Sequence, residues 1–238
     1  LSSNCLNGGE FMITSGNERI LIIAPHADDE VLGCGGLIEK ACRYKNEVLV
    51  VVMAVGEVTH PHSQQTVTAN TRIKELKEAL EVLGCHAFEI VYHDKDSLLD
   101  TIPKFEIISR IDQILDRFQP TMVFIPLPSY HQDHIVLFEA CFASLRPRPS
   151  QLIKLIAMYE YPLISWQFQK FWNTGELYLD LSNTIQKKVD SFLKHKSQRR
   201  PQTHLISPES VKKWAEMRGL EIGLPYAEKY YILRSHIL

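Results

Sequence analysis

The chain has 238 residues, of which 45% are hydrophobic and 23% charged, a composition typical of a folded globular protein of about one α/β domain. The formal net charge of −2 gives no electrostatic footprint for nucleic acid, and no apolar run approaches the roughly 20 residues of a membrane-spanning helix. The five cysteines are scattered without a CxxC pair, which argues against a disulfide framework and favours a reducing, cytoplasmic setting.

The first eleven residues, LSSNCLNGGEF, precede the first methionine and show no periodicity. We interpret residues 1–11 as a candidate vector-derived leader that lies outside the fold. The remainder contains no internal repeat and no low-complexity segment, so we assign residues 12–238 to a single domain.

From residue 19 onward, short β-branched runs alternate with amphipathic stretches. The runs predict strands at residues 20–24, 47–55, 87–92, 121–126 and 153–161. The first two are continuously apolar, as expected of strands covered on both faces. The alternation predicts an α/β fold: a three-layer, Rossmann-like, mostly parallel sheet with helices on both faces.

Two apolar stripes at helical spacing lie between these strands. One consists of Ile73, Leu76, Leu80 and Leu83, and Gly84 follows it as a C-cap. The other consists of Ile107, Ile111, Ile114, Leu115 and Phe118, with Pro103 near its first turn.

The last third of the chain is less regular. We expect a strand at 176–182, a helix at 184–195 and a helix that begins with Ser207 as N-cap and Pro208 at its first position. Residues 227–238 predict a final edge strand.

A histidine and three acids follow the first predicted strand in the stretch APHADDE, residues 24–30. Gly33, Gly35 and Gly36 come next, but their spacing misses the GxGxxG dinucleotide pattern, and three carboxylates would repel a pyrophosphate. We expect these glycines to allow close packing of the helix on the sheet. Asp28 or Asp29 could alternatively cap that helix.

A divalent cation would stabilise the clustered acids. His26 and Asp29 offer an imidazole nitrogen and a carboxylate oxygen, and HQDH (residues 131–134) follows a later strand of the same sheet. Because the carboxyl ends of parallel strands share one edge, either histidine of HQDH could complete a ligand set that leaves a position open for water.

These motifs resemble the PIG-L/LmbE-like zinc deacetylases of N-acetylglucosaminyl compounds. The resemblance is carried by PHADDEVLGCGG at 25–36, RIKELKEALEVLG at 72–84 and HQDH at 131–134, with a weaker match at HKSQ, 195–198. It spans residues 19–200, and the order of the elements agrees throughout.

The resemblance implies zinc ligands and catalytic groups in this chain. The implied ligands are His26, Asp29 and His134, with Asp28 as the general base and His131 as the general acid that protonates the leaving amine. Asp133 would hold the His131 ring or, alternatively, cap the following helix, and we expect Glu30 to accept amide or hydroxyl donors behind the site. The same ligands would also accept Fe²⁺ or Co²⁺.

The implied substrate contacts are less specific. Arg72 would meet a substrate hydroxyl or phosphate, or pair with Glu75 on the same helix face. Some family members carry a carbonyl-polarising tyrosine two residues before the first histidine of HxDH. Here that position is Ser129, and Tyr130 beside it is the substrate-binding candidate. His60 and His62 lie in a loop that could overhang the site.

The resulting hypothesis is a zinc-dependent hydrolase that removes the acetyl group from an N-acetylglucosamine-type conjugate, a small-molecule partner. Two alternatives stay open: an amidase that cuts a larger acyl group or a sugar–thiol conjugate, and a non-catalytic sugar- or nucleotide-binding module. The sequence is also compatible with a homo-oligomer.

Overall fold

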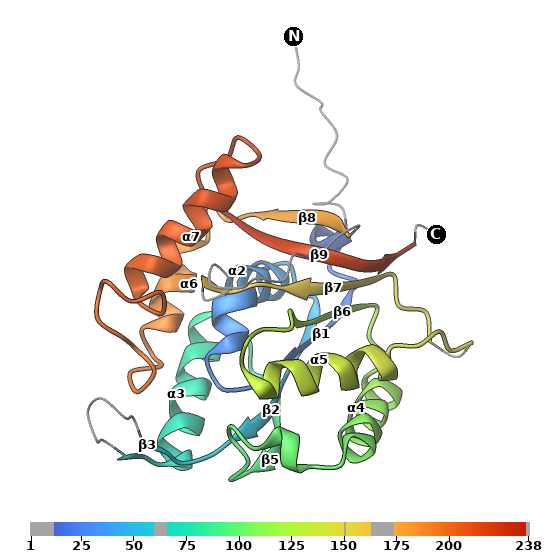
Figure 1. Ribbon diagram of the computed structural model, residues 1–238. Coiled ribbons are helices and arrows are strands. Elements are labelled where there is room, and N and C mark those ends of the chain that lie inside the picture. Colours follow the sequence, from blue (N-terminus) through green and yellow to red (C-terminus); the bar gives the residue numbers. More distant parts are fainter. Residues whose placement is uncertain (1–11, 60–65, 150, 163–173, 237–238) are drawn as a thin grey trace.

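The computed structural model describes residues 12–59, 66–149, 151–162 and 174–236 (Figure 1). The predicted leader at 1–11 and the loop with His60 and His62 lie outside these residues. A seven-stranded sheet has the strand order β5-β2-β1-β6-β7-β9-β8. Its strands are β1 (Arg19–Ala24), β2 (Glu47–Val55), β5 (Phe88–His93), β6 (Met122–Pro126), β7 (Leu155–Tyr159), β8 (Gly175–Asp180) and β9 (Ala227–Ser235).

The sheet is parallel from β5 to β7 and antiparallel at its other end, where β9 pairs with both β7 and β8. The predicted mostly parallel sheet is therefore confirmed. A separate short hairpin is formed by β3 (Val58–Thr59) and β4 (Thr66–Val67).

Helices cover both faces of the sheet (Figure 1). The helices are α2 (Asp29–Arg43), α3 (Ala69–Val82), α4 (Lys104–Phe118), α5 (Gln132–Ser144), α6 (Ile185–Phe192) and α7 (Pro208–Leu220), with a 3₁₀ helix η1 (Leu99–Thr101). None of the described helices is long and apolar enough to cross a membrane.

Successive side chains of β1 point to opposite faces, which divides the apolar core into two layers. Ile20 and Ile22 pack in the layer with α2 and α3, whereas Leu21 and Ile23 pack in the layer with α4 and α5. The two predicted apolar stripes form the buried faces of α3 and α4. The continuous apolar run of β1 is thus explained by burial on both sides.

Local signals at helix ends were accurate. The Ser207 hydroxyl accepts a hydrogen bond from the amide of Ser210, with Pro208 in the first turn of α7. The C-terminal strand was predicted wrongly as an edge strand. β9 lies between β7 and β8, so the edge strand is β8. Although β8 comes earlier in the chain, it pairs on the outer side of β9.

Gly33 has the packing role that the sequence suggests. A β-carbon at this position of α2 would lie 2.1 Å from the Tyr159 ring of β7, so only glycine allows the helix to approach the sheet this closely.

The order of the strands sets the place of the site. From β1 the chain moves by way of α2 to β2 on one side, while β6 pairs with β1 on the other side. The loops that follow β1 and β6 therefore emerge beside each other at the carboxyl edge, where open α/β sheets bind ligands.

Candidate active site

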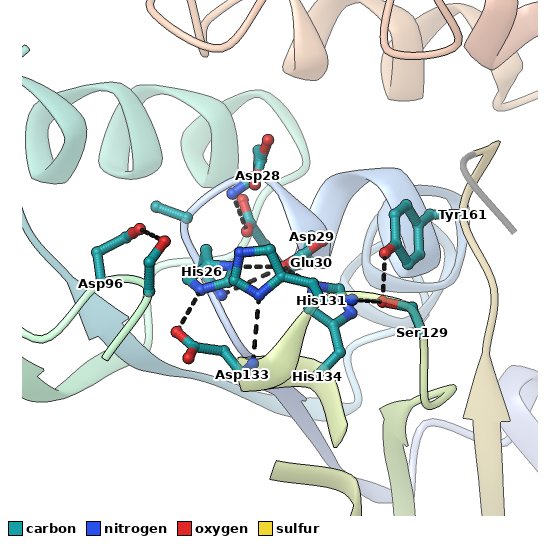
Figure 2. A network of polar contacts seen from close by, with 12 residues as sticks. His26, Asp28, Asp29, Glu30, Asp96, Ser129, His131, Asp133, His134 and Tyr161 are labelled. Atoms are coloured by element: carbon teal, nitrogen blue, oxygen red, sulfur yellow. Dashed lines mark hydrogen bonds and ion pairs between the residues drawn. The ribbon is translucent and has the colours of Figure 1, made fainter. Parts of the chain in front are cut away.

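Two histidines and an aspartate meet where the loops after β1 and β6 come together (Figure 2). Asp29 begins α2, and its Oδ2 lies 3.4 Å from His26 Nδ1 and 3.3 Å from His134 Nε2. All three residues are buried, and one ligand atom of each lies within 4.8 Å of the others. The structure therefore brings together the three residues expected to be metal ligands.

Asp133 does not hold the His131 ring as predicted. Its Oδ2 lies 2.8 Å from His26 Nε2, and its Oδ1 accepts the amide of Leu99 at 3.0 Å. Nor does its side chain cap α5, since His131 occupies the N-cap and its Nδ1 accepts the Asp133 amide at 3.2 Å. The carboxylate is drawn to His26 because the β1 and β6 loops are adjacent.

Asp28 is held in a backbone conformation that L-residues rarely adopt, with φ at 139°. Its amide donates to Glu30 Oε2 at 2.8 Å, and the other oxygen of Glu30 lies 2.8 Å from His195 Nε2. Glu30 thus accepts an amide behind the site, as expected from the sequence. Neither Asp28 nor Asp29 caps α2 by a side-chain hydrogen bond.

The close charges shift the acid–base properties of the site. Burial, reinforced by the neighbouring Asp29, raises the pKa of Asp28 to about 7, against the opposing effect of His195 and Arg72. Burial alone would lower the pKa of His26, but its hydrogen bonds to Asp133 and Asp29 raise it to about 10. Although burial opposes it, the two flanking histidines lower the pKa of Asp29.

The pKa of His131 is shifted in the opposite direction to that of His26. Burial and the neighbouring His26 and His134 lower its pKa, which makes its protonated form a stronger acid. Because Nδ1 accepts the Asp133 amide, the proton of the neutral ring is placed on Nε2.

These residues border an open cavity of about 220 Å³. Its lining consists of His26, Asp28, Asp29, Leu32, Val58, Arg72, Asp96, Ser97, Tyr130, His131, His134, Tyr161, Gln198, Arg200 and Ile206. All predicted site residues line it except Asp133, which is fully buried behind His26.

Arg72 lines the cavity but does not pair with Glu75. Its guanidinium pairs with Asp96, which follows β5, and its Nε has no hydrogen-bond partner among the described residues. Glu75 instead accepts the amide and hydroxyl of Ser197. Arg72 therefore has an unpaired buried donor among the described residues, and Asp96 is a cavity residue that sequence reasoning missed.

A family profile matches residues 21–145, which are more than half of the chain; its description is PIG-L, GlcNAc-PI de-N-acetylase. The chain belongs to the PIG-L family. The matched segment contains both motifs of the buried cluster, and the family is one of deacetylases that act on N-acetylglucosamine-type substrates.

Individual PIG-L relatives agree with this assignment. The uncharacterized deacetylase YaiS of Escherichia coli K12 is 28% identical over 197 residues, which cover 78% of this chain and 96% of the relative. A probable N-acetyl-α-D-glucosaminyl L-malate deacetylase 2 of Bacillus anthracis is 28% identical over 56% of this chain and 62% of its own length.

A solved structure shares the fold. The N,N′-diacetylchitobiose deacetylase of Pyrococcus horikoshii superposes with a TM-score of 0.72 over 98% of this chain and 95% of the other. Sequence identity between the two is 22%, so the likeness concerns the architecture alone.

The PIG-L motifs did not point to Tyr161, which follows β7 and lines the cavity. Its ring lies 5.1 Å from the His134 ring, and its hydroxyl donates to Ser129 Oγ at 2.9 Å. Burial raises the pKa of Tyr161, so the hydroxyl stays protonated at neutral pH. The only sequence signal was its position as the last residue of the strand predicted at 153–161.

Proposed function

We propose that this protein is a zinc-dependent hydrolase that removes the N-acetyl group from an N-acetylglucosamine-type conjugate. The observation that carries the proposal is the buried set of His26, Asp29 and His134 at the wall of an open cavity, with Asp28 beside it.

The donors present fit a divalent cation. Two imidazoles and a carboxylate are a common ligand set for catalytic zinc, and His134 Nε2 faces Asp29 while its Nδ1 has no hydrogen-bond partner among the described residues. The acidic surroundings that favour a proton on His26 equally favour a cation, whose binding would release that proton. When bound, a zinc ion makes water a stronger acid and polarises an amide carbonyl. Fe²⁺ or Co²⁺ could serve with the same ligands.

The chain's own groups handle the protons. Asp28, whose pKa lies near 7, takes a proton from water as the water oxygen bonds to the carbonyl carbon. In its protonated form, His131 gives a proton to the amide nitrogen as the C–N bond breaks and returns to the neutral ring, which releases acetate and the free amine. Arg72 offers its buried Nε–H to a substrate oxygen.

The cysteines bear on the location of the enzyme. Cys34, Cys42, Cys85 and Cys141 are free thiols, which supports a reducing, cytoplasmic location. We also treat residues 12–238 as one domain.

A larger acyl group would use the same catalytic residues, so a screen must vary the acyl group as well as the aglycone.

The test is a deacetylation screen over N-acetylglucosamine conjugates with the metal-free protein and with defined divalent metals. We expect amine release that depends on added zinc. In a metal-replete Asp28→Ala variant, turnover is expected to fall by at least about 10²-fold with metal content unchanged, because only the base is lost. Near-full activity of this variant would remove Asp28 from its role, and inactivity of the wild type with every metal and conjugate would overturn the function.

A further inference from the structure

A tyrosine hydroxyl is fixed beside the predicted metal ligands, on the opposite side from Asp96 (Figure 2). Tyr161 is 3% exposed, and its ring lies 5.1 Å from that of His134 at an interplanar angle of 39°. The hydroxyl is 2.9 Å from Ser129 Oγ, which also accepts the amide of His131 at 3.2 Å. One serine therefore ties Tyr161 to the loop that carries His131.

Hydrolysis of an amide is accelerated by hydrogen-bond donors to the carbonyl oxygen, in addition to the polarisation that a bound metal would supply. As water adds to the carbonyl carbon, the π electron pair moves to that oxygen, and donors already in place stabilise the negative charge without reorganisation. Among the roles given above, Asp28 is the base, His131 is the acid and Arg72 donates to a substrate hydroxyl or phosphate oxygen, so no side chain yet donates to the carbonyl oxygen.

Two tyrosines line the cavity, and they differ in how well they are held. Tyr130 is 56% exposed on the loop after β6, whereas Tyr161 is buried and its ring packs against His134. A buried, packed hydroxyl loses little freedom when it binds an oxyanion, whereas an exposed side chain must first be ordered.

We propose that Tyr161 is a catalytic residue whose hydroxyl donates to the developing oxyanion, and that Ser129 is the residue that positions it. Ser129 already accepts a hydrogen bond from His131, so its own hydroxyl proton can turn to the Tyr161 oxygen. The Tyr161 proton is then directed to the substrate. This inference rests on the proposed deacetylase function.

The first experiment compares Tyr161→Phe with the wild type on the best conjugate from the screen. The phenyl ring retains the packing, so kcat is expected to fall about 10²- to 10³-fold while KM changes less than about threefold. A tetrahedral methylphosphonamide analogue of the substrate is expected to lose affinity by a similar factor. Zinc content and the thermal unfolding midpoint report whether the variant is intact.

Two matched tyrosine variants separate this role from others. Tyr178 lies on β8 outside the cavity, and its hydroxyl donates to Glu221; Tyr178→Phe is expected to leave kcat and analogue affinity unchanged. Tyr130→Phe tests the rival donor. If Tyr130→Phe instead of Tyr161→Phe loses kcat and analogue affinity, or if Tyr161→Phe keeps both in an active enzyme, Tyr161 is not the donor and the deacetylase function still stands.

Ser129→Ala tests the positioning step. The single variant is expected to reduce kcat about tenfold, and in the Tyr161→Phe background the same change is expected to have no further effect, because Ser129 acts through that hydroxyl. Additive losses in the double variant would contradict the coupling.

Discussion

The two ends of the sheet both bury many charged side chains, but they use them differently. At the antiparallel end, acids and bases are paired: Glu160 with Arg218, Lys229 with Glu176 and Glu221, and Lys188 with Glu228. At the parallel end, Asp28 and Asp29 stand beside histidines, Asp28 has a strained φ, and the pKa values of Asp28 and His26 are strongly shifted.

The difference shows how structural charge is distinguished from functional charge. Lys188 donates to Glu228 and to the carbonyl of Leu32, while Glu228 also accepts the amides of Gly36 and Leu37, so this pair completes its own hydrogen bonding. Among the described residues, no lysine or arginine forms an ion pair of that kind with Asp28 or Asp29. A cluster of buried acids and histidines without such lysine or arginine partners is one that a ligand or metal can neutralise.

The largest expected effect comes from removing an ion pair at the antiparallel end of the sheet. Glu228→Gln leaves Lys188 as an uncompensated buried charge, so we expect a loss of about 3–5 kcal/mol in unfolding free energy, measured by urea denaturation. The matched control is Glu176→Gln, whose half-exposed side chain pairs with Lys229 and should cost only about 0–1 kcal/mol. The zinc affinity of the folded Glu228→Gln protein should match that of the wild type. A selective loss of zinc with unchanged stability would contradict the distinction between structural and functional charge.

Sequence reasoning predicted the parallel part of the sheet well, and it predicted that His26, Asp29 and His134 would lie together. His26 and Asp29 are three residues apart, and His134 is placed by a rule that depends only on strand ends sharing an edge. The composition of the strands predicts their burial, as the unbroken apolar runs of β1 and β2 show.

What the sequence could not provide were contacts set by the relative placement of loops. Asp133 contacts His26, and Arg72 contacts Asp96, because segments far apart in the chain emerge from neighbouring strands. Tyr161 looks like one more aromatic residue at the end of an apolar strand until the fold places it beside His134. The position of β9 inside the edge likewise depends on a long-range connection, not on its own residues.

Asp133 sharpens the comparison within the site itself, because it contacts a residue that we predict to be a metal ligand. Its carboxylate holds His26 Nε2, which leaves Nδ1 turned toward Asp29. We expect Asp133→Asn to weaken zinc binding about 10- to 100-fold, measured by competition with a chelator. His131→Asn should abolish turnover with nearly unchanged zinc affinity. Equal zinc affinities for wild type and Asp133→Asn would show that the contact does not orient the ligand.

The smallest expected effect concerns His195. It forms a buried ion pair beneath the site, as the charged residues do at the antiparallel end of the sheet. Its burial lowers its pKa, but Glu30 raises it more strongly, so the folded-state pKa lies above the ordinary value of 6.5. A raised histidine pKa stabilises the fold fully below the unfolded-state pKa, and this stabilisation is lost as the pH rises through the folded-state value. We therefore expect His195→Gln to cost about 1–3 kcal/mol near pH 6 and progressively less at higher pH.

Urea unfolding of both proteins from about pH 5.5 to 9 measures this difference, with His86→Gln at an exposed position as a control expected to stay within about 0.5 kcal/mol. A difference that grows with pH would mean that His195 is neutral in the folded protein and that Glu30 carries its charge unpaired. A difference that shrinks would show that the strained Asp28 loop rests on an ion pair. In that case His195 neutralises Glu30, which holds the Asp28 loop. The acids that face the cavity then remain for a ligand or metal to neutralise.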